Sequence, residues 1–354
     1  MTEQATHLWI RAEQRANEER VGITPEGVKS LLDKGLRVTI EDSATRVLPT
    51  GAYAEAGAEI APEGSWPDAP RDALIFGLKE LPEGDAPLHH RHIMFGHAFK
   101  GQSGAGAFLS RFTRGGGALY DLEYLVDKDN RRVAAFGYWA GYAGAAVSLL
   151  AYAAQDRGET CPPVSTWKNA EAMRAEVATA LNGATPRALV IGALGRVGSG
   201  ARALCEELDL KVTQWDMAET AHGGPFPEVL AHEVFFNCIL AMPGVPQFVP
   251  ADAGSRDRAL RVIGDIACDP TSAYNPVPVY DAATSWAAPV TRVHDTPPLD
   301  VMAIDNLPSL LPLESSQDFA AQLLPHLATL DAMDAGVWGR ARATFDHHAK
   351  ETSR

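Results

Sequence analysis

A glycine-rich segment in the middle of the chain places the strongest constraint on the fold. GALGRVGSGA (192–201) lies between an apolar stretch typical of a buried strand, RALVIG (187–192), and a stretch typical of a helix, GRVGSGARALCEEL (195–208). Continuous apolar residues are expected in a parallel strand that is covered on both faces. Glycines at a strand–helix turn let backbone N–H groups approach a phosphate beside the helix N-terminus. The segment therefore predicts a nucleotide-binding βαβ unit.

The match to the dinucleotide pattern GxGxxG is incomplete, but an acidic residue downstream strengthens it. Ala193 occupies the first glycine position, and Gly195 and Gly198 occupy the second and third. Asp216 ends the next predicted strand, KVTQWD (211–216), where an acid bonds the adenosine ribose hydroxyls and repels a 2′-phosphate. We therefore predict an NAD site. The alternative is a glycine-rich turn followed by an incidental aspartate.

The position of this unit predicts the domain organisation. It begins near residue 187 of 354, so a region long enough for a domain of its own precedes it. Strand-like and helix-like stretches alternate in both regions, which indicates parallel, doubly wound sheets. We predict an α/β fold with two Rossmann-like domains and a cleft between them. A catalytic domain comprises 1–136 with 310–354, and an NAD-binding domain comprises 137–309, beginning with a long Gly- and Ala-rich linking helix at 137–155.

Composition and charge exclude other classes of protein. No run of eighteen consecutive apolar residues occurs, so a membrane span is not expected. The net charge of −14 disfavours nucleic acids and anionic membranes as partners. The four cysteines, Cys161, Cys205, Cys238 and Cys268, lack metal-like spacing and predict free thiols with no metal site. The N-terminal residues lack a signal-peptide pattern, so we expect a cytoplasmic protein.

Two predicted strands of the first domain end in titratable residues. ALIFGLK (73–79) ends at Lys79, and HIMFGH (92–97) ends at His97. Strand ends are common positions for active-site groups in α/β proteins, so both residues are candidates for proton transfer. Burial can lower the pKa of a lysine into the working range, and a histidine already titrates there. The alternative is that both residues are simply the first hydrated positions after core strands.

Three arginines are candidates for binding a carboxylate group. Arg20 lies in EERVGITP, and Arg131 and Arg132 precede VAAFGYWAG. A guanidinium group pairs with a carboxylate through two parallel hydrogen bonds. Taken singly, each is better explained as a surface arginine. Glu123 in YDLEYL is a candidate for orienting or tuning one of the proton-transfer groups.

The motifs occur in an order that resembles one known family. Between about residues 7 and 345 the chain contains, in this order, RAEQRANEERVGITP, GLKE, FGHAFKGQ, LYDLEYL, RRVAAFGYWAG, GALGRVGSGA, TQWDMAETAHGGPF, FFNCIL and AIDNLPSLLP. With this set the chain resembles saccharopine dehydrogenases of the NAD-dependent, lysine-forming type. GLKE and ERVxxTP are shared more widely, with alanine dehydrogenases and transhydrogenases, whereas FGHAFK, LYDLE and RRVAAFG are narrower.

The resemblance implies roles for individual residues. It identifies Lys79 and His97 as the acid–base pair. The substrate-binding residues that it implies are Arg20, Lys79, Lys100, Glu123, Arg132 and Phe136. We predict that NAD is bound by the residues that the resemblance implies, together with Gly198 of the glycine motif and Leu240. The full set is Arg131, Gly195, Arg196, Gly198, Asp216, Thr220, Leu240, Ile266, Ile304, Asp305, Asn306 and Leu307.

Two positions depart from the pattern of some relatives. Val197 stands where some have a cysteine, so no disulfide between this position and Cys238 is predicted. Leu240 stands where some have a tyrosine. Both lie near the predicted adenosine side, so they bear on cofactor affinity more than on the chemistry.

The implied reaction is the reversible, NAD-dependent conversion of saccharopine to lysine and 2-oxoglutarate. Hydride leaves the glutarate α-carbon for NAD, and the resulting imine is hydrolysed with acid–base catalysis by the lysine and histidine. The expected partners are these small molecules, and we expect a monomer or small homo-oligomer. One alternative is a related dehydrogenase acting on alanine or another opine-like secondary amine. Another is a catalytically silent NAD-binding protein on the same fold.

Overall fold

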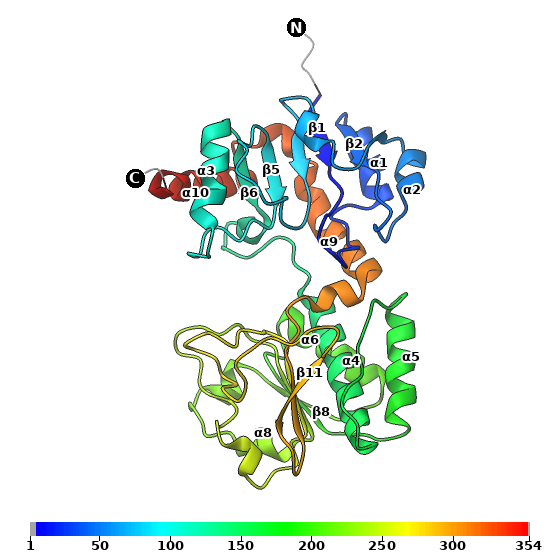
Figure 1. Ribbon diagram of the computed structural model, residues 1–354, viewed down its shortest axis with the longest axis vertical. Helices are drawn as coiled ribbons and strands as arrows, with labels where there is room; N and C mark the ends of the chain where they lie inside the picture. Colours follow the sequence, from blue (N-terminus) through cyan, green and yellow to red (C-terminus); the bar gives the residue numbers. More distant parts are fainter. Residues whose placement is uncertain (1–4, 353–354) are drawn as a thin grey trace. The chain divides into compact units, whose positions relative to one another are not determined.

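The computed structural model describes residues 5–352, and the chain divides into two compact units (Figure 1). The divisions fall after Ala135 and after Glu314. Unit 1 therefore combines the N-terminal and C-terminal segments, and unit 2 is the segment Phe136–Glu314. Among the described residues, each unit is built around one six-stranded sheet.

The sheet of unit 1 is parallel throughout, with strand order β3-β2-β1-β4-β5-β6. Its strands are β1 (His7–Ile10), β2 (Arg37–Glu41), β3 (Glu59–Ala61), β4 (Leu74–Phe76), β5 (Arg91–Met94) and β6 (Ala118–Asp121). The strand order reverses between β1 and β4, where Ile10 pairs with Phe76. In open parallel sheets, ligands bind beyond the carboxyl ends of the strands at such a reversal. The segments that leave β1, β4 and β5 therefore frame the candidate site.

Helices from both ends of the chain cover this sheet. They are α1 (Pro25–Asp33), α2 (Thr50–Glu55), α3 (Ala105–Gly115), α9 (Pro312–Leu327) and α10 (Gly336–Thr352). The start of α1 is encoded locally: the Thr24 hydroxyl accepts the N–H of Gly27 at 3.2 Å, and Pro25 occupies the first helical position. In the C-terminal segment, α10 packs against β6 and α3.

The sheet of unit 2 has the order β11-β12-β10-β9-β7-β8. Its strands are β7 (Ala188–Ile191), β8 (Val212–Trp215), β9 (Val234–Asn237), β10 (Val262–Asp265), β11 (Val290–His294) and β12 (Leu299–Met302). All neighbouring pairs are parallel except β11 with β12. β11 was not predicted from the sequence; it lies at the sheet edge, and most of its side chains are partly exposed.

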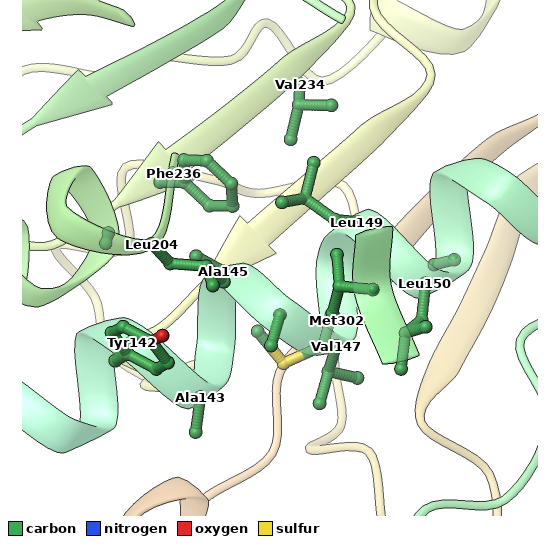
Figure 2. Packing of buried hydrophobic residues seen from close by; sticks show 14 of the residues in the cluster. Tyr142, Ala143, Ala145, Val147, Leu149, Leu150, Leu204, Val234, Phe236 and Met302 are labelled. Atoms are coloured by element: carbon green, nitrogen blue, oxygen red, sulfur yellow. The ribbon is translucent and has the colours of Figure 1, made fainter. Parts of the chain in front are cut away.

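The helices of unit 2 are α4 (Gly137–Asp156), α5 (Ala170–Leu181), α6 (Arg196–Glu207), α7 (Met217–Thr220) and α8 (Pro227–Ala231). The long helix predicted at 137–155 is α4, and it belongs to the core of unit 2. It is buried continuously from Gly141 to Gln155 and packs against α5, α6 and the sheet (Figure 2). A helix that is apolar all round is expected to be buried on all sides.

Two mostly parallel α/β sheets confirm the predicted fold class. The strands that were predicted to end at Lys79 and His97 are shorter, however, and end at Phe76 and Met94. Both titratable residues therefore lie in loops three positions beyond a strand. At Lys79 the reason is local, because a carboxylate rather than a neighbouring strand accepts the backbone N–H groups there. Among the described residues, none of the helices is both long enough and apolar enough to cross a membrane.

Candidate active site

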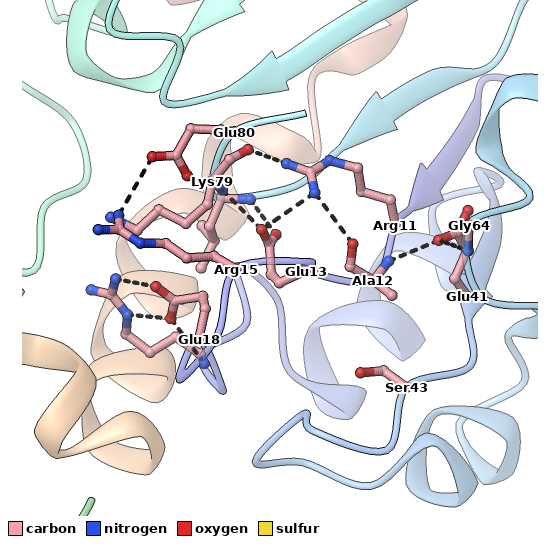
Figure 3. A network of polar contacts seen from close by, with 12 residues as sticks. Arg11, Ala12, Glu13, Arg15, Glu18, Glu41, Ser43, Gly64, Lys79 and Glu80 are labelled. Atoms are coloured by element: carbon pink, nitrogen blue, oxygen red, sulfur yellow. Dashed lines mark hydrogen bonds and ion pairs between the residues drawn. The ribbon is translucent and has the colours of Figure 1, made fainter. Parts of the chain in front are cut away.

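Lys79 lies in the loop after β4, and its peptide groups are held from the segment that follows β1 (Figure 3). The carboxylate of Glu13 accepts the N–H groups of Leu78 at 2.6 Å and Lys79 at 2.9 Å. The guanidinium of Arg11 donates to the carbonyl oxygen of Lys79 and lies 3.3 Å from Glu13. The reversal of strand order between β1 and β4 makes these two loops neighbours.

The side chain of Lys79 lies in the electrostatic field of a buried ion pair. Arg20 donates from Nε and Nη2 to the two carboxylate oxygens of Glu18, at 2.7 and 2.6 Å. Burial lowers the pKa of Lys79 from its ordinary value, and Arg20 lowers it further against the opposing effect of Glu18. Burial alone would raise the pKa of Glu18, but the bonds and charge of Arg20, together with the charge of Lys79, lower it. In this arrangement the amine of Lys79 loses its proton more readily than the amine of an exposed lysine does.

His97 lies in the neighbouring loop after β5, in a backbone conformation with φ of +47°. Such a conformation is uncommon outside glycine and clusters at functional sites. The preceding residue, Gly96, donates its N–H to buried Asp121 at the end of β6, at 3.2 Å. Burial raises the pKa of Asp121 to about 6, and the charge of nearby Glu123 acts in the same direction.

A pocket of about 370 Å³ in unit 1 opens beside His97. Its lining includes Glu80, Met94, His97, Ser103, Phe108 and Arg111. Mixed apolar and charged linings of this kind are typical of small-molecule sites.

Glu123 joins two of the predicted substrate-binding cations. Its carboxylate lies 2.6 Å from the ammonium of Lys100 and 3.5 Å from the guanidinium of Arg132. Burial alone would raise the pKa of Glu123, but the bond from Lys100 and the charges of Lys100 and Arg132 together lower it. Both cations are partly exposed, so their charge faces solvent as well as the carboxylate.

The structure brings most, but not all, of the predicted substrate-binding residues into one unit. Arg20, Lys79, Lys100, Glu123 and Arg132 all belong to unit 1. Phe136 begins unit 2, as the residue before α4.

The predicted NAD-binding residues are also divided between the units. Arg131 belongs to unit 1, where it is paired with Asp127 and Asp129, and the other predicted residues belong to unit 2.

The glycine turn between β7 and α6 explains why GxGxxG is incomplete. The residue with a positive φ, +86°, is Gly192 rather than the residue at position 193. Gly192 and Ala193 both donate their N–H groups to the carbonyl oxygen of Trp215 on β8, at 2.9 and 3.0 Å. A Cβ atom at Gly198 would lie 2.1 Å from the carbonyl oxygen of Gly192, so only glycine permits this approach of helix to strand. The special backbone position therefore lies one residue before the fingerprint begins.

Asp216 follows β8 and stands against this turn. Its carboxylate accepts the N–H of Leu194 at 3.1 Å and the N–H of Met217 at 2.9 Å. Thr220 donates its hydroxyl to the carbonyl oxygen of Asp216 at 3.0 Å. In the part of the chain that the structure describes, no side chain caps the N-terminus of α6 at Gly195, which leaves that terminus suited to an anion.

The remaining predicted NAD-binding residues differ in exposure. The side chains of Ile266, Ile304 and Leu307 are buried in the core cluster that contains α4. Asp305 is exposed and Asn306 is partly exposed.

Unit 2 has several exposed apolar side chains. Of these, only Leu240 was among the predicted NAD-binding residues. Leu194, Met217, Leu240 and Met242 are exposed by 76%, 82%, 61% and 54%, and they follow β7, β8 and β9. Large apolar residues that follow the carboxyl ends of parallel strands and stay exposed indicate a surface that a ligand covers. The signal was present in the sequence as apolar residues directly beyond each strand.

The contacts of Arg11, Glu13 and Glu18 were also missed. Their sequence signal was the charge-rich segment RAEQRANEER (11–20), which directly follows β1. Within residues 5–352, the structure shows no cluster of His, Cys, Asp and Glu suited to a metal ion. The four cysteines are free thiols.

Comparisons with known proteins show which proteins share this fold. Residues 9–143 match the N-terminal domain of the alanine dehydrogenase/PNT family. The fold resembles that of an L-alanine dehydrogenase, with a TM-score of 0.71 and 16% identity over 98% of this chain and 100% of that chain. It also resembles a transhydrogenase from Sinorhizobium meliloti, with a TM-score of 0.62 and 17% identity over 94% of this chain and 97% of that chain. At these identities the likeness shows the fold alone.

Curated relatives narrow the class to one family. The chain is 44% identical to "Saccharopine dehydrogenase [NAD(+), L-lysine-forming]" of Schizosaccharomyces pombe, over 97% of this chain and 98% of the relative. It is also 44% identical to the Neurospora crassa protein of the same name, over 96% of each chain. The chain belongs to the family of NAD-dependent, lysine-forming saccharopine dehydrogenases. This membership confirms the resemblance inferred from the motifs.

Proposed function

We propose that this chain catalyses the NAD-dependent, reversible conversion of saccharopine to lysine and 2-oxoglutarate. The observation that carries the proposal is the near-full-length match to relatives named for this activity. The retained residues Lys79, His97, Arg20 and Arg132 support it, because a silent nucleotide-binding protein has no need of all four.

The cations of unit 1 suit a substrate with several carboxylates. Arg20, Lys100 and Arg132 each already contact a carboxylate of the protein, Glu18 or Glu123. These acidic partners hold the cations in place before a substrate arrives, which limits the ordering needed on binding. The pocket beside His97 gives the substrate room within unit 1.

The glycine turn, Asp216 and Thr220 are the proposed NAD site in unit 2. The N-terminus of α6 suits the pyrophosphate, and the carboxylate of Asp216 suits the ribose hydroxyls. The exposed side chains of Leu194, Met217 and Leu240 offer apolar surface for the adenine ring. The chemistry that bound NAD supplies is acceptance of the hydride that leaves the glutarate α-carbon.

Lys79 and His97 supply the proton transfers of the reaction. The substrate amine must lose a proton so that its lone pair can drive hydride departure, and water must then be deprotonated as it adds to the imine. A lysine whose pKa burial has lowered can hold a proton at one step and release it at another. The two groups lie on neighbouring loops, so they serve the same region of the sheet edge.

Oxidation of NADH, followed by absorbance, tests the proposal. We expect turnover with lysine plus 2-oxoglutarate and none with pyruvate plus ammonia. Turnover only in the second mixture would assign the chain an alanine dehydrogenase activity instead. If neither mixture is turned over while NADH binds, the chain is a silent nucleotide-binding protein.

A further inference from the structure

We propose that Arg11 and Glu13 are positioning residues that clamp the peptide groups of Lys79 and so fix its amine for proton transfer. The proposal deepens the proposed function and rests on it for the role of Lys79. Arg11 and Glu13 belong to the segment after β1, and Lys79 to the loop after β4. The reversal of strand order in the sheet of unit 1 places these loops side by side.

The clamp engages the catalytic loop on both its donor and its acceptor groups. Glu13 accepts two successive N–H groups, of Leu78 and Lys79, and Arg11 donates to the carbonyl oxygen of Lys79. The backbone N–H and C=O groups of residues that directly follow a strand normally bond to a neighbouring strand or to water. Here two charged side chains supply those bonds, and charge-assisted bonds are stronger than neutral ones.

Gly77 is part of the same device. A Cβ atom at this position would lie 2.4 Å from Nε and 2.5 Å from Cζ of Arg11. The guanidinium therefore lies directly against the backbone of the residue two positions before Lys79. The glycine of the GLKE motif is needed here because the arginine occupies the space of a side chain.

The clamp is itself anchored to the buried carboxylate of Glu41 on β2 (Figure 3). Glu41 accepts the N–H of Ala12, between the two clamp residues, at 2.9 Å. It also accepts the N–H groups of Gly64 at 3.0 Å and Trp66 at 2.6 Å and the indole N–H of Trp9 at 3.1 Å. Four donors on one carboxylate leave the Arg11–Glu13 segment little freedom to move.

The clamp acts by position more than by net charge. The side chains of Arg11 and Glu13 are almost wholly buried, exposed by 1% and 9%, and their opposite charges cancel at a distance. What they determine is whether the Lys79 amine stays within its partly buried environment. If the loop is released, water reaches the amine and its pKa returns towards that of an exposed lysine.

Two variants test the clamp by different routes. The double variant Arg11→Met/Glu13→Gln removes both charges together, so no buried charge is left alone and the net charge is unchanged. Gly77→Ala keeps both charges and displaces the guanidinium by inserting a methyl group. Glu59→Gln, which loses an exposed carboxylate paired with Arg37, is the control for the first, and Gly51→Ala, with open space around its Cβ position, is the control for the second.

The first readout is independent of turnover. Trace acetylation with acetic anhydride across a pH series, read at the Lys79 peptide by mass spectrometry, gives the pH midpoint at which this amine becomes reactive. The other lysines of the same sample serve as references. We expect the midpoint to rise in both variants towards about 10.4, the value of an exposed lysine, and to stay at the wild-type value in both controls.

The second readout is the split between kcat and KM. A misplaced catalytic group lowers turnover by about 10- to 100-fold, and the KM for saccharopine is expected to change little. A folded variant with the wild-type labelling midpoint overturns the proposal, whether or not its turnover falls. If the wild-type protein does not turn over saccharopine, the proposed function fails, yet the labelling midpoints still decide whether Arg11 and Glu13 control the environment of Lys79.

Discussion

Lys79 and His97 share a mode of placement that side-chain contacts alone do not reveal. Each lies in a loop three residues beyond a parallel strand, and each loop is held by a carboxylate that accepts backbone N–H groups. For Lys79 the carboxylate is Glu13, and for the loop of His97 it is Asp121. The backbone is fixed in this way, and the lysine and histidine side chains are the ones assigned to the proposed proton transfers.

Removal of either proton-transfer group is expected to slow the reaction strongly. Lys79→Met and His97→Gln should each lower kcat by about 10²- to 10⁴-fold, the usual contribution of a general acid–base group. NADH affinity should survive, since the proposed nucleotide site lies mainly in unit 2. Steady-state kinetics and a fluorescence titration with NADH check both statements. Near-wild-type turnover in both variants would remove the pair from the mechanism.

His92 is a buried titratable residue that the proposed reaction does not use. It packs edge-on against Trp66 and Phe112, with ring centroids 5.1 and 5.4 Å away. Neither ring nitrogen has a hydrogen-bond partner among the described residues. Burial lowers the pKa of His92 well below its ordinary value, and the charge of Arg11 adds to this. The folded protein therefore holds a neutral imidazole where the unfolded chain takes up a proton.

This histidine predicts a loss of stability in acid. Below pH ~6.5, where histidine in the unfolded chain binds a proton, the free energy of unfolding should fall by about 1.4 kcal/mol per pH unit until His92 protonates in the native state. Between pH 7.5 and pH 5.0, the free energy of unfolding measured in urea should therefore fall less in His92→Leu than in wild type, by up to about 2 kcal/mol. His89→Gln, which removes an exposed imidazole, is the control. An equal loss in His92→Leu and wild type would contradict the prediction.

Residue types at the candidate site were predictable from the sequence, but their partners were not. Lys79, His97 and Asp216 were recognisable because they follow apolar strands in specific motifs. The role of Glu13 was hidden because it depends on which strand lies beside β4. A linear sequence contains the charged segment after β1, but it does not show that the two loops meet.

At the scale of elements, small residues on α4 and α6 determine how unit 2 packs. A Cβ atom at Gly141 would lie 1.8 Å from the carbonyl oxygen of Val197, and one at Gly200 would lie 1.8 Å from that of Tyr138. The two helices therefore meet backbone to backbone. The Gly- and Ala-rich composition of 137–155 predicted a long helix, and α4 spans these residues. The composition did not show which elements bury the helix, because close contact between helices depends on glycines at matching positions in both.

Gly200→Ala should force the two helices apart. Overpacking of this kind typically destabilises a protein by about 1–3 kcal/mol. The affinity for NADH should fall as well, because α6 also presents its N-terminus at the glycine turn. Gly51→Ala is the matched control, since it lies in α2 with nothing within 4 Å of its Cβ position and is expected to be neutral or mildly stabilising. Urea unfolding and NADH titration of both variants provide the comparison, and unchanged stability in Gly200→Ala would show that α6 adjusts without cost.

Strand ends were the least predictable feature of the elements. Apolar runs indicated the centres of β4 and β5, but both predicted strands extended three residues too far. The error has a physical cause, since Leu78 is as apolar as a strand residue while its N–H bonds to Glu13. Hydrophobicity reports burial, whereas the end of a strand depends on where its hydrogen bonds go.

At the scale of the whole molecule, the position of one glycine turn was the most informative part of the sequence. A nucleotide unit that begins near residue 187 requires a separate structure before it, and the alternation of strands and helices predicted that this structure is also a parallel α/β sheet. The C-terminal segment returns to unit 1. In the sequence it is recognisable as helices that come after the last strand of unit 2. The chemistry is thereby divided, with the proposed acid–base groups in unit 1 and most of the proposed NAD contacts in unit 2.

This division predicts that cofactor affinity and proton transfer respond to different variants. Asp216→Ala should raise the Kd of NADH about tenfold or more, because a bond to a charged group contributes about 1.5–3 kcal/mol, and it should weaken discrimination against NADPH by removing the repelling charge. The acetylation midpoint of Lys79 should not change in this variant. Lys79→Met should show the converse, with lost turnover and a wild-type Kd for NADH. Both variants are titrated with NADH and NADPH. An unchanged Kd in Asp216→Ala would show that the ribose is bound elsewhere in unit 2. A higher Kd for NADH in Lys79→Met would show that cofactor binding and proton transfer are not separable by unit.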